Sequence, residues 1–132
     1  MWPYLGAVIG AAVTHLIAAG DVPHGVTLVP APTKPSSARA RGGDHVTAMC
    51  AASGYGYVNA VYHGMRVHDS VGLDLTSRRA NVAGNIVLRT VPPGPLLIVD
   101  DIVTTGSTIE ATAAALMSRG GSVIGALVLA AV

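Results

Sequence analysis

Apolar runs that alternate with helical patterns are the feature that most limits the fold of this chain. Strand patterns occupy 26–30, 57–62, 85–89, 96–100 and 122–132. Apolar residues with the spacing of a helix occur before or between these strand patterns, over 5–19, 44–53 and 107–119. The continuous apolar runs 26–30, 96–100 and 122–132 predict strands buried on both faces. This order predicts an α/β fold, with a mainly parallel sheet flanked by helices, and 1–132 is expected to form a single domain.

The N-terminal apolar stretch is predicted to be a helix of the domain and not a signal or membrane segment. No Lys or Arg precedes it, Thr14 and His15 interrupt it, and from Leu5 to Ala19 it is too short to span a bilayer. Its spacing predicts a helix covered on both sides and ended by Gly20. With Cys50, the only cysteine, expected in the core, the chain is predicted to be cytoplasmic and not attached to a membrane.

The charge balance excludes some classes of function. The net charge is +1 and aromatic residues make up 4% of the chain, so the basic and aromatic surface typical of direct nucleic-acid binding is not expected. Lys34 is the only lysine, and no G-x-x-x-x-G-K precedes a helix, which excludes a P-loop kinase.

An acid pair, Asp100 and Asp101, follows one of the apolar runs, and the polar loop 104–108 then leads directly into a helix. Adjacent acids repel, so a ligand must make this arrangement worthwhile. Backbone N–H groups, hydroxyls and the helix dipole predict that the loop binds an anion, and Gly106 allows a tight turn. Carboxylates suit vicinal sugar hydroxyls. The stretch therefore predicts a site for a phosphorylated ribose, with a divalent cation to offset charge.

The segment LLIVDDIVTTGST, 96–108, resembles the signature of type I phosphoribosyltransferases. The resemblance implies a type I phosphoribosyltransferase-like, Rossmann-like fold and a site for phosphoribosyl pyrophosphate. It implies Mg²⁺ held through the ligand, near Asp100 and Asp101, with no direct protein ligand. Asp100 and Asp101 would hold the ribose hydroxyls. The residues implied to wrap the 5′-phosphate are Thr104, Thr105, Gly106, Ser107 and Thr108, and those implied to meet pyrophosphate are Pro30, Ala31, Pro32, Thr33 and Lys34.

Two further segments, 28–45 and 72–88, resemble the ComF family of competence-associated phosphoribosyltransferase-like proteins, which are tied to DNA uptake. Gly43, Asp44 and His45 stand where that family has an aromatic residue, Asn and Gln, and the sequence does not say what replaces the contacts of that pair. The cysteine-based zinc-binding segment with which the family usually begins is not seen. The chain is either a trimmed member or starts upstream of Met1.

The resemblance implies substitution at C1 of the ribose, with a mobile hood within 66–79 closing over the site. Lys34, Arg78 and Arg79 are the candidate catalytic residues, because cations would stabilise the charge on departing pyrophosphate. The first hypothesis is phosphoribosyl transfer to or from a nitrogenous acceptor. The alternative is a non-catalytic module that binds phosphoribosyl pyrophosphate or a nucleotide and is linked to DNA uptake. The acceptor, turnover and the oligomeric state, including a homodimer, stay open.

Overall fold

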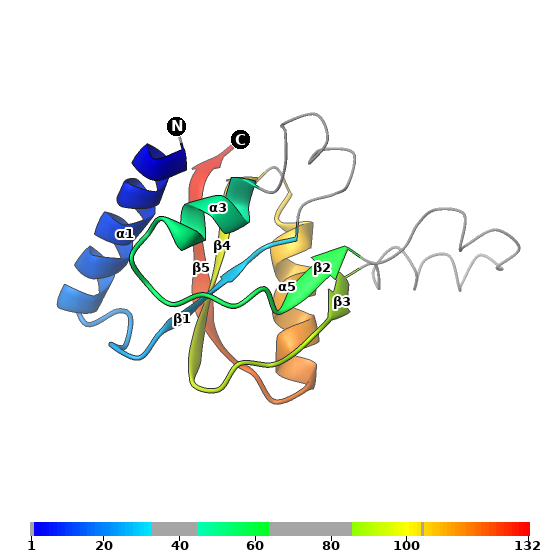
Figure 1. The fold of residues 1–132 in the computed structure, drawn as a ribbon. Helices are drawn as coiled ribbons and strands as arrows, with labels where there is room; N and C mark the ends of the chain where they lie inside the picture. The colour runs from blue at the N-terminus through cyan, green and yellow to red at the C-terminus, as the bar shows by residue number, and fades with distance from the viewer. Residues whose placement is uncertain (1, 33–44, 64–85, 104) are drawn as a thin grey trace, which may run out of the picture.

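The computed structural model describes residues 2–32, 45–63, 86–103 and 105–132 (Figure 1). Its elements, in chain order, are α1 (Trp2–Ala18), β1 (Thr27–Pro30), α3 (His45–Ala51), β2 (Val61–His63), β3 (Ile86–Leu88), β4 (Pro95–Val103), α5 (Ser107–Ser118) and β5 (Ser122–Ala131). The predicted α/β class is confirmed, because a mainly parallel sheet is flanked by helices.

The main sheet has the strand order β1-β4-β5, and both pairings are parallel. Pro30 pairs with Val99, so the loop after β1 starts beside the acid pair of β4. A separate antiparallel pair, β2 and β3, lies next to α5 (Figure 1). Because β1, β4 and β5 run in the same direction, their carboxyl ends meet at one edge of the sheet, where ligands bind in such folds.

Alternate residues of β4 enter two different cores. Leu97 and Val99 pack with the buried residues of α1 and α3, whereas Leu96 and Ile98 pack with Leu116 of α5. Figure 1 shows α1 and α3 to one side of the sheet and α5 to the other. This arrangement explains the continuous apolar run, because a strand covered on both faces needs apolar side chains at every position.

Helix α1 approaches the end of α3 closely. A Cβ on Gly6 would lie 2.3 Å from Cβ of Ala52, and one on Gly10 would lie 2.3 Å from the carbonyl oxygen of Ser53. Thr14 Oγ1 is also 2.6 Å from the hydroxyl of Tyr55, which follows α3. Glycine is therefore required at two positions of α1 by packing, since a side chain would collide with the next segment.

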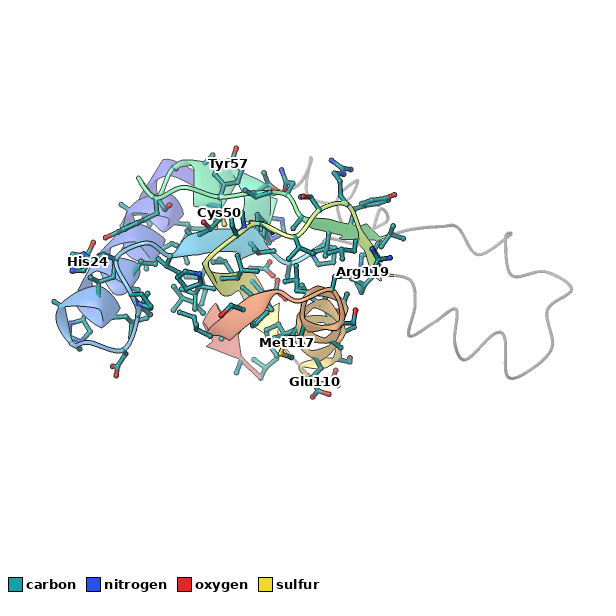
Figure 2. All side chains as sticks on the ribbon, turned by 90° about the horizontal axis from the view of Figure 1, so that it is seen from below. His24, Cys50, Tyr57, Glu110, Met117 and Arg119 are labelled. Atoms are coloured by element: carbon teal, nitrogen blue, oxygen red, sulfur yellow. The ribbon has the colours of Figure 1, made fainter. Side chains whose placement is uncertain are left out.

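The predicted end of α1 is confirmed, since the helix stops at Ala18 and Gly20 has a φ of 84°. Asp21 N–H donates to the carbonyl of Leu16 at 2.9 Å, which satisfies an end group of the helix. Cys50 is fully buried, as predicted, and Figure 2 shows it between α3 and β1. In the part of the chain that the structure describes, no helix is long and apolar enough to cross a bilayer.

Three burial predictions were wrong. Helix α1 is covered on one side only, with Tyr4 72% exposed, and β5 is an edge strand of the described sheet, with Ile124 40% exposed. Met117 of α5 was expected inward but is 53% exposed, and Thr112 is buried in its place. The Thr112 hydroxyl donates to the carbonyl of Thr108 at 2.7 Å, which satisfies its polar group inside the core.

The 57–62 strand prediction was also only partly right. The strand β2 starts at Val61, and Tyr57 contributes a single parallel bridge to Leu28. The polar and glycine-broken sequence over 63–76 predicts a loop, 77–84 predicts a short helix, and Asp44 is the N-cap predicted for the helix at 44–53. Asp44, the loop after His63 and the short helix lie outside the described residues.

Candidate anion and sugar site at the carboxyl edge of the sheet

Strand β4 continues through the acid pair to Val103, although the apolar pattern predicted an end at Asp100. The extension is stabilised by pairing with β5, where Asp100 lies opposite Val128 and Val103 opposite Ala131. Side chains alternate along a strand. Asp100 is therefore on the α5 side of β4, and Asp101 is on the α3 side.

A hollow of about 180 Å³ lies beside Asp100, between the end of β4 and the start of α5. Its lining consists of Asp100, Ile102, Val103, Thr105, Gly106, Ser107, Thr108 and Ile109. It is smaller than the ~300–1,000 Å³ of sites for drug-sized ligands, so its size suits a phosphate and part of a sugar. The structure thus brings the first acid of the pair and the described part of the predicted anion loop to one place.

The loop places a helix N-terminus at this hollow. Gly106 is the N-cap of α5, with φ 81° and no side-chain cap hydrogen bond. Thr105 Oγ1 and Ser107 Oγ are 2.7 Å apart, and Ser107 N–H donates to Thr105 Oγ1 at 3.3 Å. Because a helix leaves its first N–H groups without intrahelical partners, this geometry is suited to an anion. Figure 2 shows Glu110, the acid of the first turn, directed away from the sheet.

His45 joins this site from a distant part of the chain. It is the first residue of α3 and is 5% exposed, and its Nε2 is hydrogen-bonded to Oδ2 of Asp101. The Asp101 side chain is 16% exposed. In the sequence, His45 is marked only by its departure from a family pattern, and this contact was not predicted. The available signal was its position, because the helix that follows β1 begins at the same edge of the sheet as the acid pair.

The two carboxyl groups of the acid pair differ strongly in pKa. Burial raises the pKa of Asp100 to about 6. The hydrogen bond from the backbone N–H of Asp101 lowers this pKa, whereas the side-chain hydrogen bond with Asp101 and the repulsion from its charge raise it. Burial also favours a higher pKa for Asp101, but the hydrogen bonds from His45 and the Ile102 backbone lower it to about 2. Asp101 is therefore ionised at neutral pH, whereas Asp100 takes up a proton near pH 6.

The loop after β1 begins beside the acid pair. Ala31 N–H donates to the carbonyl of Val99 at 2.8 Å, and Pro30 and Ala31 are buried while Pro32 is partly exposed. The remaining predicted site residues, Thr33, Lys34, Arg78, Arg79 and Thr104, lie outside the described residues, as do hood residues 66–79. Their roles stay predictions.

The donor groups at this edge suit a metal ion that arrives on a ligand. Within 2–32, 45–63, 86–103 and 105–132, no three His, Cys, Asp or Glu side chains gather as a metal-binding group. Mg²⁺ commonly keeps several waters and binds substrate phosphates in sites that have few protein carboxylates. Such an ion, carried by phosphate oxygens, is compatible with an acid pair of which one member is already held by His45.

Comparison with known proteins gives a match to part of the chain. No curated protein sequence matches the chain. Residues 68–132 match the family model described as the phosphoribosyl transferase domain. The matched stretch includes β4 with its acid pair, the loop that leads into α5, and β5. The part of the chain that forms the hollow is thus similar in sequence to a phosphoribosyl transferase domain.

Proposed function

We propose that the chain is a ComF-like phosphoribosyltransferase that binds phosphoribosyl pyrophosphate with Mg²⁺ at the hollow. The observation that carries the proposal is that Asp100 lines the same hollow as Thr105, Gly106, Ser107 and Thr108. An anion-binding helix start and a carboxyl group are the two features that a phosphorylated ribose needs, and the match over 68–132 is to the corresponding domain.

Within this proposal, the 5′-phosphate lies against the start of α5. The backbone N–H groups of the first turn and the hydroxyls of Thr105 and Ser107 donate to its oxygens. The ribose hydroxyls donate to Asp100 and Asp101. Ionised carboxylates accept such hydrogen bonds with about twice the strength of neutral groups. Proton loss by Asp100 near pH 6 therefore favours sugar binding at neutral pH.

The proposed reaction breaks the bond from ribose C1 to the pyrophosphate oxygen and forms a bond from C1 to a nitrogen of the acceptor. The electron pair of the broken bond leaves with pyrophosphate, and the acceptor nitrogen loses its proton to solvent or a base. Mg²⁺ would neutralise the charge of the pyrophosphate. Lys34, Arg78 and Arg79 are proposed to stabilise the same charge, with Pro30, Ala31, Pro32 and Thr33 lining the pyrophosphate side.

A non-catalytic module that holds phosphoribosyl pyrophosphate or a nucleotide is the second candidate. One observation favours it: among the described lining residues of the hollow there is no Lys or Arg. Arg89 instead stacks on Tyr62, with its guanidinium carbon 4.8 Å from the ring centre, and Arg119 follows the end of α5. Catalysis therefore depends on cations outside the described residues, whereas binding of the sugar phosphate does not.

Calorimetry with ribose 5-phosphate, and with phosphoribosyl pyrophosphate plus Mg²⁺, tests the proposal. Both ligands are expected to bind, and a panel of nitrogenous bases is expected to release pyrophosphate from the second. Binding without release from any base would favour the non-catalytic module. If ribose 5-phosphate does not bind at all, both versions of the proposed function are wrong.

A further inference from the structure

His45 connects α3 to the acid pair in a way that packing alone does not require. The helix is already anchored by Val46, Met49 and Cys50, each at most 1% exposed, in the core beneath α1. A buried hydrogen bond adds only modest net stability, since folding exchanges hydrogen bonds to water for hydrogen bonds within the protein. The pair with Asp101 is therefore better explained by what it does to the site.

The contact separates the two carboxyl groups of the acid pair. Side chains alternate along β4, so Asp101 is directed toward α3, where its Oδ2 is hydrogen-bonded to the imidazole of His45. Asp100 stays on the α5 side and lines the hollow. A carboxylate tied to a buried ring has lost most of its freedom to turn. Asp100 is held separately, because the backbone N–H of Asp101 donates to its Oδ1 at 2.8 Å.

We propose that His45 is a positioning residue, which orients Asp101 so that the acid pair presents a preformed arrangement to the ribose hydroxyls. The inference rests on the proposed function and adds a residue from α3 to the sugar site. Preorganisation lowers the cost of binding, since groups already held in place lose less freedom when the ligand arrives. The 5′-phosphate lies against the start of α5 and does not contact His45 or Asp101, so its binding is independent of this pair.

The test compares two ligands on one set of variants. His45→Leu keeps bulk and removes the hydrogen bond, and His45→Gln restores an N–H donor at a similar reach. We expect His45→Leu to lower the affinity for ribose 5-phosphate about tenfold, as measured by calorimetry, while the affinity for inorganic phosphate changes less than twofold. His45→Gln should return the ribose 5-phosphate affinity to within about threefold of wild type.

Two controls separate positioning from a structural role. Thr47→Val, in the same helix, removes the 3.0 Å hydrogen bond to Oδ1 of Asn59 and should leave the affinity for both ligands unchanged. In an Asp101→Ala background, His45→Leu should cause no additional loss of affinity for ribose 5-phosphate, because the acceptor that His45 orients has been removed. If His45→Leu does not fold, His45→Asn, a polar side chain too short to reach Asp101, replaces it and should show the same split between the ligands.

The outcomes are distinguishable. Wild-type protein that binds no ribose 5-phosphate would overturn the proposed function and this inference together. Wild-type binding with an unchanged affinity in His45→Leu would overturn the inference alone, as would equal losses for inorganic phosphate and ribose 5-phosphate.

Discussion

The backbone N–H of Asp101 donates a 2.8 Å hydrogen bond to Oδ1 of Asp100, so the first acid of the pair is turned back onto its own strand. The Asp100 carboxyl is then half-buried next to a second carboxylate, and its pKa rises to about 6. A carboxyl whose pKa is raised on folding contributes stability below its unfolded value of 3.8 and loses that contribution as the pH rises through 6.

We predict that Asp100→Asn stabilises the protein at pH 8 and has no effect near pH 4. At pH 8 the change removes an ionised carboxylate held against Asp101, for a gain of about 1 kcal/mol after allowing for solvent screening of a half-exposed group. At low pH the wild-type carboxyl is already protonated and resembles the amide. Thermal unfolding at both pH values measures the difference. A stabilisation that persists at pH 4 would show that the cost of holding an ionised carboxylate there, through burial and the neighbouring Asp101, is not its cause.

Replacing both acids by Asn should abolish sugar recognition. Asp100→Asn with Asp101→Asn keeps the shape but removes both charged acceptors, and should cost on the order of 2–4 kcal/mol of binding to phosphoribosyl pyrophosphate with Mg²⁺. Calorimetry measures this loss. Asp21→Asn, at an exposed position after α1, is the matched control and should bind as wild type does. An unchanged affinity in the double variant would mean that the acid pair does not hold the ribose.

Gly106 is required by its backbone conformation and not by lack of space. Among the described residues, a Cβ there would meet only Oε1 of Glu110, at 3.8 Å, so these residues leave room for a side chain. The φ of 81° lies in the left-handed region, which costs a β-branched residue about 1–3 kcal/mol. We predict that Gly106→Val changes the loop and loses phosphate binding.

A matched control exists for this prediction. Gly94, in the turn before β4, has φ 80°, and no atom of the described residues would lie within 4 Å of a Cβ added there. Gly94→Val should lower the melting temperature about as much as Gly106→Val but keep affinity for inorganic phosphate. Normal phosphate density in a crystal of Gly106→Val soaked with ribose 5-phosphate would contradict the role of Gly106.

The close approach of α1 and α3 gives a prediction about stability alone. Gly10→Ala would place a Cβ 2.3 Å from the carbonyl oxygen of Ser53 and should force the helices apart, at a cost of about 1–3 kcal/mol. Gly25→Ala, at a position where no atom of the described part of the chain lies within 4 Å of an added Cβ, should stay near wild type. Urea unfolding of both variants provides the measurement. Equal stability of the two variants would show that α1 and Ser53 can move apart without lowering the free energy of unfolding.

The sequence by itself determined the local elements and the first half of the site. Apolar runs predicted β1, β4 and β5, and for β1 and β4 the reason given by the sequence holds, because a parallel strand between two layers must be apolar on both faces. Gly120, which follows the helical pattern of α5 in the sequence, has φ 86° just after the helix ends, a conformation that few other residues adopt. The acid pair and the loop into α5 were also found from the sequence, because their chemistry depends on residues that are neighbours in the chain.

Tertiary structure alone decided which side of each element is buried and how the acid pair is divided. Helical spacing placed Met117 with the core, but Thr112 faces it, because an Ala-rich helix carries too little contrast between its sides to set its rotation. The contact between His45 and Asp101 joins residues 56 positions apart. It forms because β1 ends at the same edge of the sheet as the apolar run of β4. No local sequence pattern predicts that two segments so distant in sequence will meet.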